Sequence, residues 1–284
     1  MANPAENNVK NESPAQENKM GVMPVGKLLF TMSLPIMISM LVQALYNVVD
    51  SMFVARVSEN ALTALSMAFP IQNLMIAVST GLGVGLNAVL SRALGAKDEK
   101  GVNRAATNGI MLLFICGLVF MLGGATIVRP YFEMQTDIAE IVESGVDYTT
   151  IVMLGSMGIF MQILFERLLQ STGRTLLTMV SQGVGAIANI ILDPIFIFGL
   201  FGVPKMGVAG AAYATILGQW IAAAIGLVMN IRKNPEVSIS MKGFRPHGAT
   251  IRRILAIGIP SVVMQSIGSI MTFLMNQILI AFSA

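Results

Sequence analysis

Seven long apolar stretches follow one another along the chain, separated by short polar segments. Each is long enough to cross about 30 Å of hydrocarbon as an α-helix. Backbone groups in hydrocarbon must be satisfied within a segment, and no barrel-type alternation is visible, so the pattern predicts membrane-spanning helices. The predicted spans are residues 28–54, 61–89, 106–128, 146–168, 176–200, 208–230 and 254–281.

The segment before the first span has a different character. Residues 1–27 are rich in Asn, Glu, Pro and Lys and show no apolar periodicity. Such a sequence cannot bury enough apolar surface to offset the entropy of ordering, so we expect a disordered tail.

Composition supports a membrane protein. Of the 284 residues, 55% are hydrophobic and only 12% are charged, whereas soluble domains average roughly 25% charged residues. The single cysteine excludes a disulfide framework, and one cysteine with one histidine excludes a zinc or haem cluster. The fold class predicted is an all-α polytopic membrane protein.

The distribution of cations predicts the orientation. If the N-terminus is cytoplasmic, 15 of the 18 Lys and Arg residues fall in inner segments, and only Arg56, Arg129 and Lys205 fall outside. The positive-inside rule therefore places the N-terminus in the cytoplasm. Because the cations serve orientation in this interpretation, we expect a lipid bilayer and no nucleic acid as partner.

A repeat indicates the domain organisation. Leu34-Pro35 near the start of the first span recurs as Ile259-Pro260 near the start of the seventh. An even number of spans separates the copies, so both have the same orientation, which is typical of the parallel repeats of transporters. The expected domains are a tail (1–27), a six-helix N-terminal lobe (28–231), a basic cytoplasmic inter-lobe loop (232–253) and the first helix of a truncated C-terminal lobe (254–284).

Two carboxylates lie well inside predicted spans, where a charge costs about 2.5–3.5 kcal/mol. Asp50 and Asp193 fall in the outer halves of spans one and five, and Asn189 lies four residues before Asp193 on the same helix face. Thr215 on span six has similar depth. The set predicts a Na⁺ site or, if no ion binds, a proton site. The alternative is that Asp50 lies at the interface and Asp193 caps a helix.

Further residues have candidate roles around this site. Pro35 and Pro194 each free a backbone carbonyl one turn earlier and are candidate bending points. Gln43 and Asn73 are candidate cavity residues, although hydrogen bonds between helices explain them equally well. Separately, Gly81 and Gly85, four residues apart, predict close helix packing.

Four segments resemble the multidrug and toxic compound extrusion (MATE) transporters, most of all the bacterial multidrug efflux branch. The resemblance covers residues 27–284 and is carried by these motifs: LPIMISMLVQALYNVVDSMFVAR (34–56), LSRALGAKDEKGVNRA (90–105), LLQSTGRTLLTM (168–179) and NIILDPIFIFGLFGVPKMGVAGAAYAT (189–215).

This resemblance implies a twelve-helix protein of two lobes, of which helices eight to twelve are absent here. It implies a monomeric multi-pass antiporter of the bacterial inner membrane, conferring antibiotic resistance. Alternating access would exchange Na⁺ or H⁺ for organic, often cationic, drugs. By resemblance, the family's cation site corresponds to Asp50, Asn189, Asp193 and Thr215, its bending proline corresponds to Pro35, and Tyr46 and Asn47 line the same region.

Other functions remain alternatives. A lipid-linked precursor flippase of the same superfamily is expected to have a strongly cationic cavity, and no predicted span carries a central Lys or Arg. An ion channel would conduct without exchanging a substrate. An enzyme is not expected, because no nucleophile–base pair, metal cluster or phosphate loop is present. No cofactor is expected beyond the coupling ion, which the sequence leaves as Na⁺ or H⁺.

Overall fold

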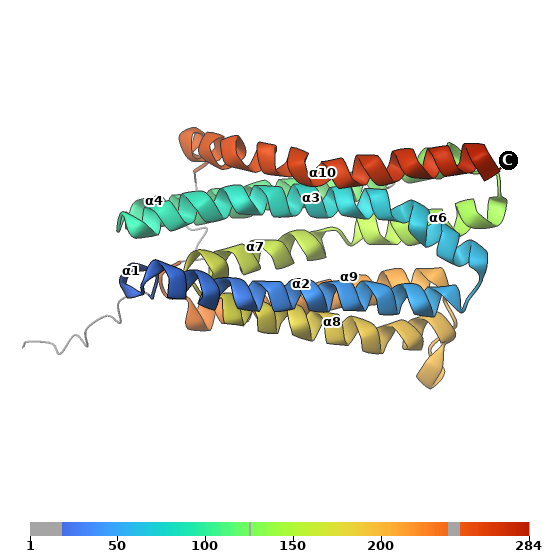
Figure 1. The fold of residues 1–284 in the computed structure, drawn as a ribbon, viewed down its shortest axis with the longest axis horizontal. Coiled ribbons are helices and arrows are strands. Elements are labelled where there is room, and N and C mark those ends of the chain that lie inside the picture. Colours follow the sequence, from blue (N-terminus) through green and yellow to red (C-terminus); the bar gives the residue numbers. More distant parts are fainter. Residues whose placement is uncertain (1–18, 125, 238–244, 284) are drawn as a thin grey trace, which may run out of the picture.

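The computed structural model describes residues 19–124, 126–237 and 245–283, and within these ranges the chain is helical, without strands. The long helices run side by side (Figure 1): α3 and α10 lie along one side, α2, α8 and α9 along the other, with α7 between them. The α-helices are α1 (Lys19–Val22), α2 (Val25–Ala55), α3 (Glu59–Gly95), α4 (Glu99–Gly124), α5 (Val128–Glu133), α6 (Ala139–Leu154), α7 (Met157–Ser171), α8 (Thr175–Phe198), α9 (Val208–Lys233) and α10 (Gly248–Ser283).

The predicted spans are confirmed as helices. Six described helices are long and apolar enough to cross a membrane, and α6 with α7 makes a seventh if a pair bent by 46° counts as one span. The bend was not predicted. It lies at Gly155 and Ser156, where the Ser156 hydroxyl donates to the Gly117 carbonyl oxygen at 3.0 Å and links the break to α4.

The boundary of the predicted tail is wrong at its end. Lys19–Val22 form α1 and α2 begins at Val25, so part of 1–27 is helical. Pro24 precedes α2, and its carbonyl accepts the first helical bond from the Leu28 N–H at 2.9 Å. A proline with its fixed φ favours a helix start. Residues 1–18 lie outside the described part of the chain.

Close contacts between glycines and backbone join α3 to α10. A Cβ atom at Gly81 would lie 2.6 Å from the Val262 nitrogen, and one at Gly85 would lie 2.9 Å from the Gly258 nitrogen. Only helices that nearly touch leave so little space, which confirms the close packing predicted from the glycine spacing. The Thr80 hydroxyl adds a hydrogen bond to Gln265 Oε1 at 2.5 Å.

A second close contact joins α8 to α9. A Cβ atom at Gly185 would lie 2.8 Å from the Gly218 carbonyl oxygen, and one at Gly218 would lie 2.9 Å from that of Gly185. The buried Ser181 hydroxyl also donates to the Ala222 carbonyl oxygen at 2.7 Å. These contacts fix α8 and α9 as one unit, and α2 packs mainly against α8.

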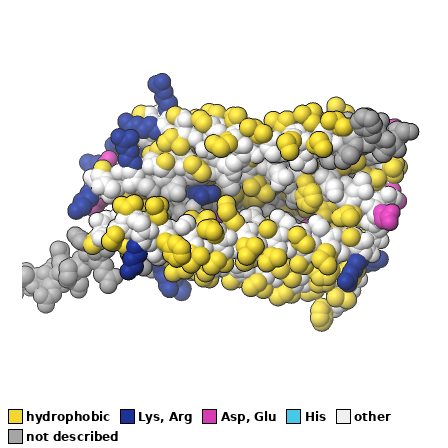
Figure 2. Space-filling view, viewed as in Figure 1, with side chains coloured by type: hydrophobic (Ala, Val, Ile, Leu, Met, Phe, Trp, Pro, Cys, Tyr) yellow, Lys and Arg dark blue, Asp and Glu magenta, His cyan; other side chains and the backbone are white. Residues whose placement is uncertain are grey.

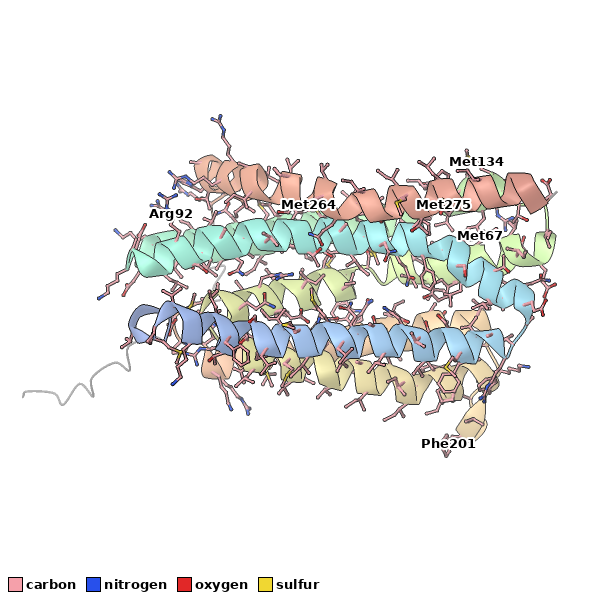
Figure 3. All side chains as sticks on the ribbon, viewed as in Figure 1. Met67, Arg92, Met134, Phe201, Met264 and Met275 are labelled. Carbon is pink, nitrogen blue, oxygen red and sulfur yellow. The ribbon has the colours of Figure 1, made fainter. Side chains whose placement is uncertain are left out.

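Charge is unevenly distributed along the bundle (Figure 2). Most Lys and Arg side chains gather at the end where α2, α4 and α10 begin, which we call the basic end. Acidic side chains lie at both ends, and only a few cations lie at the opposite end. Phe201, 91% exposed, projects from that opposite end in the α8–α9 connection (Figure 3). This uneven distribution of Lys and Arg is the basis on which the sequence predicts a cytoplasmic N-terminus. That the basic end faces the cytoplasm stays a prediction.

Replacing Ser58 with alanine is expected to destabilise the start of α3. Ser58 is the N-cap, and its hydroxyl accepts a hydrogen bond from the Ala61 N–H at 3.0 Å. Loss of such a cap costs about 1 kcal/mol. Thermal melting of the protein in detergent, followed by circular dichroism, should show a lower midpoint for Ser58→Ala. Ser58→Asp should retain most of the stability, and an equal loss in both variants would contradict the assignment.

Candidate functional site

The structure brings Asp50 and Asp193 together. Asp50 on α2 is 5% exposed and Asp193 on α8 is fully buried. The two carboxylates interact electrostatically. In each, the Oδ1 atom is buried and has no hydrogen-bond partner among the residues that the structure describes. Burying a carboxylate oxygen without a hydrogen-bond partner costs free energy. Binding of a proton, a cation or a solute by this pair would offset that cost.

Asn189 and Thr215 complete the set. When the Asn189 amide is oriented to satisfy both of its polar atoms, its nitrogen donates to Asp193 Oδ2 at 3.2 Å and its oxygen accepts from the Thr215 N–H at 3.1 Å. Both side chains are buried. The contact between α8 and α9 positions them, since a Cβ at Gly218 would lie 3.1 Å from the Asn189 Cβ.

This burial argues against the alternative that the carboxylates only cap or fray helix ends. α8 continues past Asp193 to Phe198, and its C-cap is Gly199. α2 continues past Asp50 to Ala55. The set offers carboxylate, amide and hydroxyl oxygens, which are the ligands of hard cations such as Na⁺. Among the described residues, no three His, Cys, Asp or Glu side chains cluster as a metal site. Two carboxylates therefore suit a monovalent ion or a proton.

The two candidate bending prolines lie inside continuous helices. Pro35 is buried in α2, and its carbonyl accepts a hydrogen bond from the Ser39 hydroxyl at 3.0 Å. Pro194 follows Asp193 directly within α8. Bending at either position stays a prediction.

A cavity of about 150 Å³ adjoins the carboxylate pair and is walled by α2, α3, α7, α8 and α9. Gln43, Tyr46, Asn189 and Thr215 line it, and Tyr46 forms a side-chain hydrogen bond with Gln43. Figure 2 shows the surface hollowed between the α3 side and the α2 side of the bundle. Gln43 and Tyr46, two of the residues expected to face a cavity, thus both lie in its lining.

Two of the expected cavity residues are placed elsewhere. Asn47 and Asn73 are exposed and do not line the cavity. Asn47 follows Tyr46 by one residue, and a helix turns by about 100° per residue, so it faces away from the lining side of α2. Asn73 lies nearly one turn before Ile76, the first α3 residue of the lining.

Two charged residues of the cavity were missed. Glu166 and Arg167 on α7 line it, and Glu166 is only 4% exposed. Glu166 Oε1 accepts from Gln162 Nε2 at 2.9 Å. The sequence interpretation ended the fourth span at 168, which placed both residues at its cytoplasmic end. It therefore predicted no central Lys or Arg in any span. The helix continues to Ser171, which carries the pair inside. An adjacent acid and base within MGIFMQILFERLLQS was the available signal.

Comparison with known proteins places these features in a family. The model of the MatE family matches residues 35–195. The chain is 29% identical over 259 residues to the probable multidrug resistance protein NorM of Thermotoga maritima, covering 89% of this chain and 54% of that protein. It is 28% identical over 261 residues to the multidrug export protein MepA of Staphylococcus haemolyticus, covering 90% and 56%.

Comparison with solved structures supports the same family. The outward-facing conformation of a multidrug resistance MATE family transporter of the MOP superfamily superposes with a TM-score of 0.77 at 30% identity, covering 84% of this chain and 52% of that one. The chain thus spans about half the length of the relatives that it matches. The family match includes Pro35, Asp50, Asn189 and Asp193. The chain belongs to the MatE family of membrane transporters.

Proposed function

We propose that this chain forms the N-terminal lobe (28–231) and the first helix of the second lobe (254–284) of a secondary multidrug antiporter. The complete protein exports organic, often cationic, compounds in exchange for Na⁺ or H⁺ by alternating access. The buried pair of Asp50 and Asp193, with oxygens unpartnered among the described residues and beside a cavity lined by Tyr46, Asn189 and Thr215, is the observation that supports this proposal. The names of the relatives NorM and MepA support multidrug export.

In this mechanism, the cation changes the repulsion between the two carboxylates. An entering Na⁺ would be held by oxygens of Asp50, Asn189, Asp193 and Thr215, whereas H⁺ would bind to one carboxylate of the pair. Either cation reduces the repulsion between α2 and α8, and α2 then bends at Pro35 and narrows the cavity. One charge moving through 100 mV supplies about 2.3 kcal/mol.

The cellular setting follows from the same proposal. The protein spans the bacterial inner membrane with its N-terminus in the cytoplasm, as the basic end favours. It acts as a monomer without a nucleic-acid partner, and the 232–253 segment connects the lobes on the cytoplasmic side.

Drug efflux from vesicles tests this proposal. Vesicles loaded with ethidium and containing the protein receive either a Na⁺ gradient or a pH gradient, and fluorescence follows the loss of ethidium. We expect one gradient to drive efflux and the other to have little effect. An ethidium efflux rate that neither gradient changes would contradict antiport. Ion flux without ethidium movement would indicate a channel.

A lipid-linked precursor flippase is the second candidate. The observation in its favour is Arg167, a cation inside the cavity. Glu166 balances that charge in the same cavity, so the lining is not strongly cationic. Transport of a phosphorylated lipid headgroup, with no ethidium efflux, would favour this alternative.

A further inference from the structure

The connection between α8 and α9 leaves the bundle sideways, at the end opposite the basic end. It contains a short 3-10 helix, η1 (Leu200–Gly202), and Phe201 at its centre lies beside the bundle, beyond α8 (Figure 3). Phe201 is 91% exposed and Leu200 is 45% exposed. Apolar surface is more stable away from water. The described part of the chain leaves Phe201 almost uncovered, so burial of its ring requires a partner outside that part.

Backbone contacts hold the connection in this position. At its base, the Met206 N–H donates to the Phe196 carbonyl oxygen at 3.0 Å. Gly199 has a φ of +75°, and a Cβ built there would lie 2.8 Å from the Lys205 nitrogen. The two arms of the connection therefore nearly touch, and the segment between them is a closed projection with a defined shape.

The backbone at Phe201 itself is strained. Its φ of 56° and ψ of 29° lie in the left-handed region, which costs a residue with a Cβ atom about 1–2 kcal/mol. Glycine or asparagine would adopt this conformation more easily. An aromatic ring that is strained and yet unpacked gains no compensating contact within the described chain, so we look for that contact outside it.

The length of α8 places the connection at one boundary of the hydrocarbon. α8 has 24 residues and so measures about 36 Å, whereas the hydrocarbon is about 30 Å thick. Exposed apolar side chains follow one face of α8 at spacings of three and four residues: Leu176, Val180, Val184, Ile187 and Ile191. Such a stripe on the outside of a membrane bundle faces lipid. Phe201 projects beyond its end, where acyl chains meet headgroups.

We propose that Leu200, Phe201 and Lys205 anchor the α8–α9 unit in the lipid leaflet opposite the basic end. The partner is the phospholipid interface: Leu200 and Phe201 enter the outermost part of the acyl chains, and the exposed Lys205 contacts a lipid phosphate. Aromatic rings are enriched at this depth of a membrane. Lysine binds phosphate as a point charge, while its stem lies along apolar surface.

The base of the anchor also contacts the end of α2. Phe198 packs against Phe53 of α2 edge to face, with ring centroids 6.2 Å apart. A Cβ at Gly207 would lie 3.9 Å from Val57 Cγ1. Phe53 lies nearly one turn after Asp50. The anchor therefore holds the α8–α9 unit at a fixed depth beside the helix end that carries Asp50.

Quenching of tryptophan fluorescence tests the anchor. Trp220→Phe removes the one tryptophan of the sequence, and Phe201→Trp then places a single reporter in the connection. The 284-residue chain is reconstituted into phosphatidylethanolamine–phosphatidylglycerol vesicles containing phosphatidylcholine brominated near the headgroup end of its acyl chains. We expect brominated lipid to reduce the emission at least roughly twofold and aqueous acrylamide to have much less effect, because an interfacial ring is shielded from water.

Asp137→Trp in the same background is the matched control. Asp137 is exposed in the segment between α5 and α6, which lies at the same end of the bundle. Acrylamide should quench this reporter, and brominated lipid should not. Quenching of the position-201 reporter by acrylamide alone would show that the connection lies in water and would overturn the anchor. Protection from both quenchers would show that protein covers this position, with the same consequence.

Two further variants separate anchoring from folding. Phe201→Asn removes the ring and relieves the strained backbone, so its melting midpoint in detergent should equal or exceed that of the wild type. A markedly lower midpoint would mean that the ring packs within the protein, against the proposal. In the reporter background, Lys205→Glu should weaken quenching by brominated lipid, because lipid phosphates repel a carboxylate; unchanged quenching would remove Lys205 from the anchor.

Discussion

Asp50→Asn is expected to reduce cation-coupled drug efflux at least roughly tenfold, which corresponds to about 1.4 kcal/mol. Asparagine keeps the shape of the side chain and removes the negative charge that would attract the cation. Asp50 is buried against α8, and its Oδ1 has no partner in the described part of the chain, so no described neighbour replaces its charge. Ethidium efflux from vesicles under the driving gradient measures the effect.

The control for this result is Asp137→Asn. Asp137 is an exposed carboxylate in the segment between α5 and α6, so its loss should leave efflux unchanged. Asp193→Asn should resemble Asp50→Asn, since the two carboxylates interact. Wild-type rates in Asp50→Asn, at wild-type protein levels, would remove this pair from the coupling mechanism.

The second large effect concerns stability. Gly85→Ala is expected to lower the free energy of unfolding by about 1–3 kcal/mol, the usual cost of overpacking. The added methyl group would overlap the Ile254 carbonyl oxygen and lie 2.9 Å from the Gly258 nitrogen. Both are backbone atoms, so α3 and α10 must move apart. Thermal melting in detergent should show a lower midpoint.

Gly95→Ala provides the matched comparison on the same helix. No atom lies within 4 Å of a Cβ built at Gly95. Alanine favours helix over glycine by up to about 1 kcal/mol, so this variant should melt at the same temperature or higher. If Gly85→Ala melted like Gly95→Ala, the close approach of α3 and α10 would be refuted.

Much of the fold followed from the sequence because hydrocarbon imposes simple rules. A membrane span needs a long apolar run, and each predicted run corresponds to a helix or to the α6–α7 pair. The break at Ser156 escaped prediction because it depends on a partner distant in sequence, the Gly117 carbonyl of α4. The early start of α2 was missed because the polar composition of residues 1–27 obscured the helix start at Pro24.

The candidate site was predicted in part for a similar reason. A carboxylate within an apolar run is conspicuous, and equal depth brought Asp50 and Asp193 together. Which residues line the cavity depends on how each helix is rotated about its axis and on where along the helix the cavity lies. The sequence alone shows neither the side of α2 that faces the cavity nor the position of the cavity along α3. Asn47 and Asn73 were therefore misplaced. Glu166 and Arg167 were missed because the predicted span ended beside them.

The four residues of the candidate cation site are unequally distributed between helices. Asn189, Asp193 and Thr215 all belong to α8 and α9, which the Gly185–Gly218 contact holds as one unit, whereas Asp50 alone comes from α2. The geometry of the set therefore depends on a single interhelical separation. One pair of spectroscopic labels, on α2 and α8, would report the state of the whole site during a transport cycle.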